Sequence, residues 1–126
     1  MSIDVKLENG VRVELRGGDC LKNSLSKLIN IDVELIPNFH LFPKKTWKFA
    51  FESWVKSQGY SFTETDRPVV ARCISIFRLK CKVTGEFYPL HAVVTNNGEI
   101  EFDILAGKNE SLEYAYFVRA YLINKN

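Results

Sequence analysis

Cys20 stands in "RGGDCLKNSLSKLI", where two glycines are followed by the apolar spacing of an amphipathic helix. A thiol in the first turn of a helix feels the positive end of the helix dipole and the unpaired amides of that turn. Both favour the thiolate, which is the nucleophilic form of cysteine. The same amides can stabilise an oxyanion during covalent catalysis. The structural alternative is that Cys20 packs as a small hydrophobic residue, as most free cysteines do.

A cysteine nucleophile needs a base and an orienting acid, and "LHAVVTNNGEIEFDIL" contains His91 and Asp103. The pattern predicts two strands joined at Asn96-Asn97-Gly98. With this three-residue loop one hairpin face is wholly apolar, the other is nearly all polar, and His91 lies opposite Asp103. A two-residue turn at Asn97-Gly98 would mix the two faces. We therefore expect the three-residue loop, with the His91 and Asp103 Cβ atoms roughly 5 Å apart.

Cys20, His91 and Asp103 together have the composition of a Cys-His-acid catalytic site. The acid would orient the imidazole and stabilise its protonated form. The imidazole would take the thiol proton and later return it to the leaving group. The alternative for the last two residues is a surface histidine–aspartate pair on a solvated sheet face, which contributes little.

In the segments that would position these residues, apolar residues repeat every second position in some stretches, as in strands, and about every 3.6 positions in others, as in helices. We expect one α+β domain over residues 1–126, because runs of strands and helices follow one another without a linker. The expected order is a hairpin over 3–15 around Asn9-Gly10, a helix capped by Asp19, an irregular segment over 31–43, a helix over 44–59 stopped by Gly59, strands over 68–83, a turn at Thr84-Gly85, the His91 hairpin, and a helix over 109–125 capped by Asn109.

The composition narrows the class of protein. The 126 residues are 46% hydrophobic and carry a net charge of +2, which favours a globular protein over a disordered one or a nucleic-acid binder. No apolar stretch approaches the roughly 20 residues of a membrane span, and the N-terminus has no signal-peptide pattern. An odd number of cysteines, three, does not form a disulfide framework. We therefore expect a cytoplasmic protein with no membrane partner and no nucleic-acid partner.

The remaining candidate residues favour structural roles. Cys73 and Cys81 are eight residues apart on one predicted strand, too far to form a disulfide, and share its apolar face. His40 lies in the apolar segment "PNFHLF" and favours a packing or capping role. No Cys/His spacing resembles a zinc site, and "RGGD" lacks the spacing and lysine of a phosphate-binding loop. We expect no metal and no cofactor.

Arg78, Lys80 and Lys82 share one face of the predicted strand and could contact nucleic acid. The alternative is an exposed strand face, where lysines also discourage edge pairing. The small net charge favours the exposed face.

Taken together, the motifs resemble those of papain-like cysteine peptidases, and more closely those of small phage and bacterial relatives of bacteriocin-leader peptidase domains. The resemblance spans roughly residues 17–107 and rests on the order and spacing of its elements. These are Asp19-Cys20, "ELIPNF" at 34–39, "TWKFAFESWVKSQGY" at 46–60, His91-Ala92-Val93-Val94, Gly98, and "IEFDI" at 100–104.

The resemblance implies a papain-like fold in which a helix that begins at the nucleophile packs on an antiparallel sheet. It implies Cys20 as nucleophile, His91 as general base and acid, and Asp103 as orienting group, acting on a peptide or amide bond. Papain-like enzymes usually place a Gln shortly before the nucleophile to complete the oxyanion hole, whereas the only Gln here is Gln58. A non-catalytic protein on the same scaffold, such as an anti-defence or immunity protein that binds another protein, therefore stays open as the alternative.

Overall fold

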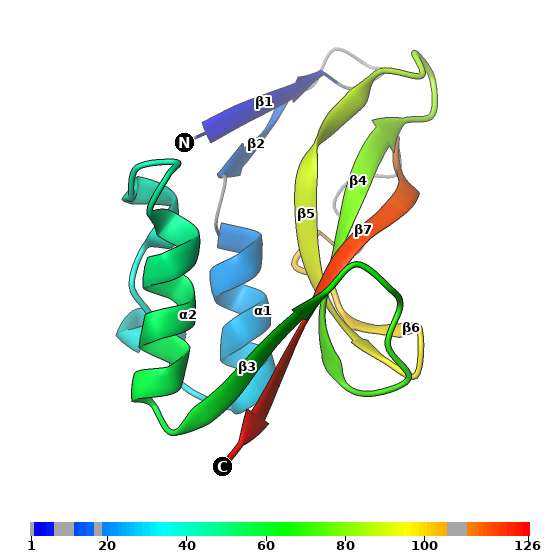
Figure 1. The fold of residues 1–126 in the computed structure, drawn as a ribbon. Coiled ribbons are helices and arrows are strands. Elements are labelled where there is room, and N and C mark those ends of the chain that lie inside the picture. The colour runs from blue at the N-terminus through cyan, green and yellow to red at the C-terminus, as the bar shows by residue number, and fades with distance from the viewer. Residues whose placement is uncertain (1, 7–11, 17–18, 106–110) are drawn as a thin grey trace.

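The computed structural model describes residues 2–6, 12–16, 19–105 and 111–126. Within these ranges the chain is α+β, with a five-stranded antiparallel sheet of order β3-β7-β4-β5-β6 and a separate two-stranded sheet, β1-β2 (Figure 1). No helix in these ranges has the length and apolar character needed to cross a membrane. The elements are β1 (Ser2–Lys6), β2 (Arg12–Arg16), α1 (Asp19–Ile29), the 3-10 helices η1 (Val33–Leu35) and η2 (Phe39–Leu41), α2 (Trp47–Ser57), β3 (Tyr60–Thr65), β4 (Cys73–Cys81), β5 (Phe87–Asn96), β6 (Glu99–Phe102) and β7 (Leu112–Lys125).

The first half of the chain follows the sequence expectations. β1 and β2 pair antiparallel, with Val5 opposite Val13, which confirms the N-terminal hairpin. The two expected helices are α1 and α2, and Gly59 has a φ of 91° just after α2 ends, which suits glycine alone among common residues. The Asn9-Gly10 turn and Gly17-Gly18 lie outside the described residues.

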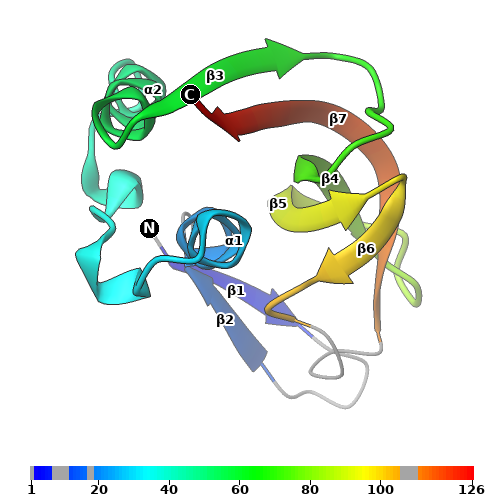
Figure 2. The same ribbon diagram turned by 90° about the horizontal axis from the view of Figure 1, so that it is seen from below.

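The hydrophobic core lies between the helices and one face of the sheet, and Figure 2 shows α1 inside the curve of that sheet. Phe51 of α2 is fully buried and meets the rings of Phe39, Phe62 and Tyr121 at centroid distances of 5.3–5.4 Å. Each such large side chain stabilises the fold by roughly 1.5–3 kcal/mol through burial. The buried cluster consists of Leu21, Leu25, Ile36, Phe39, Phe51, Val55, Ile74, Ile76, Ala92, Tyr121 and Ile123.

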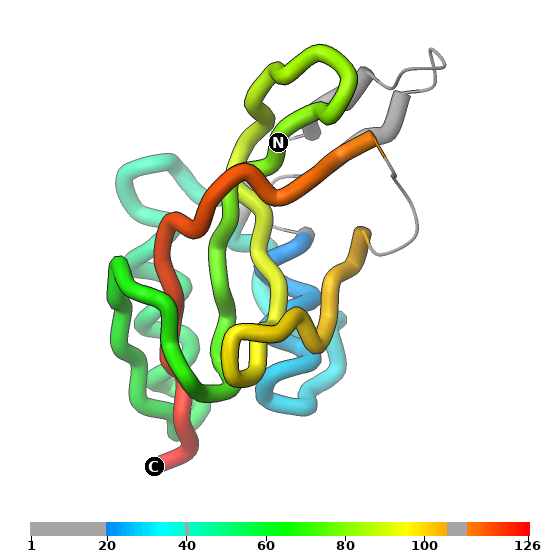
Figure 3. Tube along the Cα trace, turned by 90° about the vertical axis from the view of Figure 1, so that its right-hand side faces the viewer, coloured from blue at the N-terminus to red at the C-terminus, as the bar shows by residue number. Residues whose placement is uncertain are grey.

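The predicted helix over 109–125 is wrong in its described part, because Leu112–Lys125 forms the 14-residue strand β7. β7 lies between β3 and β4 and pairs with both (Figure 3). Two bulges in its pairing with β4 shift the side chains of β7 between the two sheet faces, so its sequence does not show the strict polar alternation that marks a half-exposed strand. The tyrosine, phenylalanine and valine content favours the strand. The proposed cap Asn109 lies outside the described residues, and β3 was not predicted.

The turn of the β5-β6 hairpin differs from the prediction. Asn96 pairs with Glu99, so the turn has two residues, and the predicted three-residue loop is wrong. Asn97 and Gly98 have φ values of 55° and 82°, both positive, as a type I′ turn requires, and the positive φ expected for Gly98 is confirmed.

The reason for this error is that the polar-looking face of β5 is not solvated. Val93 and Thr95 on that face are 0% and 3% exposed, so alternation of polarity does not report the register. A bulge follows the turn, because Thr95 pairs with Ile100 but Val94 pairs with Phe102. β6 ends at this last pair, before the aspartate that was predicted to pair with His91.

Candidate active site

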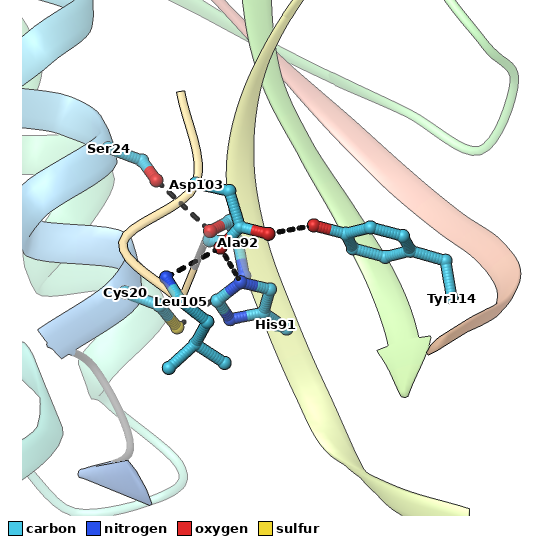
Figure 4. Close-up of polar contacts among 7 residues, drawn as sticks. All are labelled: Cys20, Ser24, His91, Ala92, Asp103, Leu105 and Tyr114. Carbon is cyan, nitrogen blue, oxygen red and sulfur yellow. Dashed lines mark hydrogen bonds and ion pairs between the residues drawn. The ribbon is translucent and has the colours of Figure 1, made fainter. Parts of the chain in front are cut away.

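His91 lies on β5 and is 3% exposed, so its imidazole needs partners inside the protein. Its Nε2 lies 2.7 Å from Oδ1 of Asp103 (Figure 4). Oδ1 also accepts the backbone N–H of Leu105 at 2.8 Å, and Oδ2 accepts the hydroxyl of Tyr114. Both carboxylate oxygens are therefore held, which fixes the plane in which Asp103 meets the imidazole.

Asp103 reaches His91 by a different path from the predicted one. The backbone pairing of His91 with Asp103 is wrong, because the bulge shifts the register and Asp103 follows the last paired residue of β6. The chain turns there, and the N–H of Leu105 bonds back to the Asp103 side chain. The two side chains thus meet through this turn after the strand.

Cys20 lies in the first turn of α1, at the edge of β5 where β6 no longer pairs. The N–H of Ala92, the residue after His91, donates to Cys20 Sγ at 3.4 Å. The carbonyl of Ala92 accepts the hydroxyl of Ser24, one helical turn later, at 3.1 Å (Figure 4). The side chains of Cys20 and Ser24 thus form the hydrogen bonds to the Ala92 backbone that a neighbouring strand would otherwise form. This attachment holds the thiol beside the histidine.

The charges of the site favour an imidazolium at His91. Burial by itself lowers the pKa of His91, but hydrogen bonds to Asp103 and Cys20 and their negative charges outweigh it and raise the pKa to about 9. Because Nε2 faces Asp103, Nδ1 is the ring nitrogen left for Cys20. His91 is therefore protonated at neutral pH, and its positive charge favours a thiolate at Cys20.

Asp103 and Tyr114 are shifted in opposite directions by the same contact. Burial raises the pKa of Asp103, but hydrogen bonds from His91 and Tyr114 and the charge of His91 outweigh it and hold the pKa below its usual value. Burial and the bond to Asp103 raise the pKa of Tyr114, so its hydroxyl keeps its proton and donates. Asp103 is therefore the charged acceptor between two donors.

A groove of about 550 Å³ opens beside Cys20. Its apolar walls come from η2, α2 and the sheet, and include Phe39, Trp47, Ile76 and Leu90. A cavity of this size and apolar character is typical of a ligand pocket. The nucleophile candidate is therefore open to a molecule in the groove, while His91 behind it is buried.

Two residues of this arrangement were not found from the sequence. Tyr114 lies in the segment predicted to be helical, so nothing placed it beside Asp103. Ser24 has a detectable signal, because its i+4 spacing puts it on the same helix face as Cys20.

The other candidate residues behave mostly as expected. Cys73 and Cys81 are free thiols, 0% and 1% exposed, which confirms core packing. The two basic residues of β4 that were considered for nucleic-acid contact have different surroundings. Lys80 pairs with Glu113 at 3.3 Å, whereas Arg78 lines the groove. The side chain of His40 lies outside the part of the chain that the structure describes. Among the described residues no group of three His, Cys, Asp or Glu side chains could hold a metal ion.

Comparisons with protein families, curated proteins and solved structures gave no significant match to this chain. The central feature of the site is one connected set of contacts that joins Tyr114, Asp103, His91 and Cys20.

Proposed function

We propose that the protein is a papain-like cysteine hydrolase or acyl-transfer enzyme that acts on an amide or peptide bond. The observation that carries the proposal is the hydrogen-bonded series from Asp103 through His91 to a cysteine in the first turn of a helix. A nucleophile, a base within hydrogen-bonding reach and a group that orients the base are the parts that covalent acyl transfer requires. The packing of α1 on the antiparallel sheet supports the papain-like architecture.

The resting site is an ion pair of Cys20 thiolate and His91 imidazolium. The thiolate sulfur attacks the substrate carbonyl carbon, forming a C–S bond and placing negative charge on the carbonyl oxygen. The C–N bond then breaks, and the leaving nitrogen takes the proton from Nδ1 of His91. A thioester at Cys20 and a neutral imidazole result.

The second half of the reaction restores the ion pair. His91 takes a proton from a water molecule, whose oxygen attacks the thioester carbon. The C–S bond breaks, releasing a carboxylic acid and regenerating the thiolate. An amine in place of water gives acyl transfer. Asp103 stays ionised throughout and holds the imidazole in line, and the Ala92 N–H helps to hold the sulfur in place.

Reaction of Cys20 with iodoacetamide tests the proposal. At pH 6.5 a free thiol of pKa about 8.5 is only about 1% thiolate, so a stabilised thiolate reacts up to about 100-fold faster. The lower nucleophilicity of a stabilised thiolate reduces this gain, and we expect at least about tenfold over glutathione. Peptide mapping by mass spectrometry identifies the modified cysteine.

The matched control compares the two histidines of the chain. His91→Gln should remove the rate advantage of Cys20, and His40→Gln should retain it. A Cys20 that stays unmodified in the folded protein, or one whose rate does not depend on His91, would contradict the enzyme proposal. It would favour the alternative of a non-catalytic binding protein.

A further inference from the structure

The groove beside Cys20 combines an apolar floor with an excess of positive charge. Among the described residues that line it, three are basic, Lys44, Arg78 and Arg119, and none is acidic. Phe42 and Leu90, which also line it, remain 42% and 39% exposed. Large apolar side chains at the edge of a hollow mark a surface that a ligand covers.

The three basic groups differ in how their charge is balanced. Arg119 pairs with Glu64 at 3.4 Å, and Glu64 also pairs with Lys48 at 2.5 Å. The Arg78 guanidinium donates to the backbone carbonyl of Tyr88 at 3.2 Å, a partner that carries no net charge. Across the described ranges, no carboxylate forms an ion pair with Arg78 or Lys44.

We propose that the groove binds an acidic peptide segment, with an apolar side chain packed on Phe42 and Trp47 and an Asp or Glu carboxylate held by Arg78. A guanidinium matches a carboxylate in planar, two-point geometry, and low-dielectric walls strengthen the attraction. Lys44, which is exposed at the edge of the groove, adds a second positive charge that attracts the carboxylate more weakly. The inference rests on the proposed function, since the bound peptide is the substrate of Cys20.

A peptide fits this groove better than a nucleic acid does. Phosphate backbones are bound by extended basic surfaces, whereas this groove is mainly apolar and the chain carries a net charge of only +2. The second basic residue of β4, Lys80, is already paired with Glu113. The charge available in the groove suits one carboxylate rather than a row of phosphates.

Binding to the Cys20→Ala variant measures this preference without turnover. The probes are two fluorescein-labelled pools of C-terminally amidated peptides, one with Glu next to Leu or Phe and the other with Gln in place of Glu. The acidic pool should bind at least about tenfold more tightly at low salt. Arg78→Gln should remove the difference, and Lys44→Gln should reduce it. Lys45→Gln changes a neighbouring exposed lysine that does not line the groove, and should leave the difference unchanged.

Three results would overturn the assignment. The first is equal affinity for both pools, and the second is a preference that persists in Arg78→Gln. The third is that neither amidated pool binds measurably while the same peptides made with a free C-terminal carboxylate do bind, because that would move the acid from a side chain to the chain end. Lys44→Gln keeps the test decisive if Arg78→Gln does not fold, since Lys44 is exposed.

A second experiment separates this inference from the proposed function. Cys20 in the otherwise unmodified protein is alkylated with neutral iodoacetamide and with anionic iodoacetate, and the rate ratio is compared with that of glutathione. The ratio should favour iodoacetate, and should fall several-fold in Arg78→Gln. A reactive Cys20 with no anion preference refutes the acidic groove alone. An unreactive Cys20 in a protein that still binds the acidic pool refutes the enzyme and retains the groove.

Discussion

Asp103→Asn removes the charge that holds His91 protonated while keeping a side chain of similar shape. The pKa of His91, about 9, lies about 2.5 pH units above its ordinary value of 6.5, which corresponds to about 3 kcal/mol in favour of the imidazolium. Burial opposes this, so the contacts with Asp103 and Cys20 together exceed that figure. Since a nearby opposite charge is worth about 1–3 pH units, we expect the pKa of His91 to fall by that amount in the variant.

Proton–carbon NMR of the histidine rings measures this directly. The chain has two histidines, and the His91 signal is identified by its loss in His91→Gln. The matched control is Glu101→Gln, which removes a carboxylate of β6 that pairs with Arg72 at 2.6 Å. His91 should titrate near pH 9 in the wild type and in the control, and at lower pH in Asp103→Asn.

The pH dependence of the stability of wild type and of Asp103→Asn gives an independent check on the direction of the His91 pKa shift. A group whose pKa is raised on folding stabilises the fold fully below its unfolded pKa, and this contribution is lost as pH rises through the folded pKa. The His91 contribution is therefore complete below about pH 6.5 and disappears by about pH 9. The excess stability of wild type over Asp103→Asn should shrink across that window in urea titrations. A wild-type His91 that titrates near 6.5, or at the same pH in Asp103→Asn, would refute the reasoning.

Tyr114→Phe removes the hydroxyl that binds Asp103. We expect the unfolding free energy to fall by about 1–2 kcal/mol and the NMR titration of His91 to move to lower pH. No change in either quantity would contradict a positioning role for Tyr114. Cys73→Ala should lower the melting temperature, because truncating a fully buried side chain costs on the order of 1 kcal/mol or more. Cys20→Ala should melt close to wild type while abolishing Cys20-dependent activity; a large drop in melting temperature would instead indicate a structural thiol.

The sequence predicted the helix that begins near Cys20 and the residues that meet beside its thiol because those signals are local. The apolar spacing after Cys20 identifies α1, and a hairpin that contains both His91 and Asp103 brings them near each other in several registers. The predicted register was wrong, yet the two side chains meet. The bulge and the turn after Phe102 together return Asp103 to the imidazole, and neither has a signature in one sequence.

The C-terminal strand could not be predicted because the burial pattern of its side chains depends on how it pairs with its neighbouring strands. β7 pairs with β3 and β4, and two bulges in the β4 pairing shift its side chains between the two sheet faces. Its burial therefore follows neither a strict period of two nor one of 3.6. A long apolar segment of this kind is ambiguous until its place in the sheet is known.

Because this segment was predicted to be a helix, the contact between Tyr114 and Asp103 was not predicted, and this contact depends on the assembly of the whole sheet. Cys20 is held by α1 against β5, His91 belongs to β5, Asp103 follows β6, and Tyr114 comes from β7. β7 joins the sheet between β3 and β4, so Tyr114 reaches Asp103 only when the last strand has been inserted. The full set of contacts around Asp103 is therefore present only when the sheet is complete. It follows that a damaged C-terminal strand should weaken the His91–Asp103 contact even though both residues lie outside that strand.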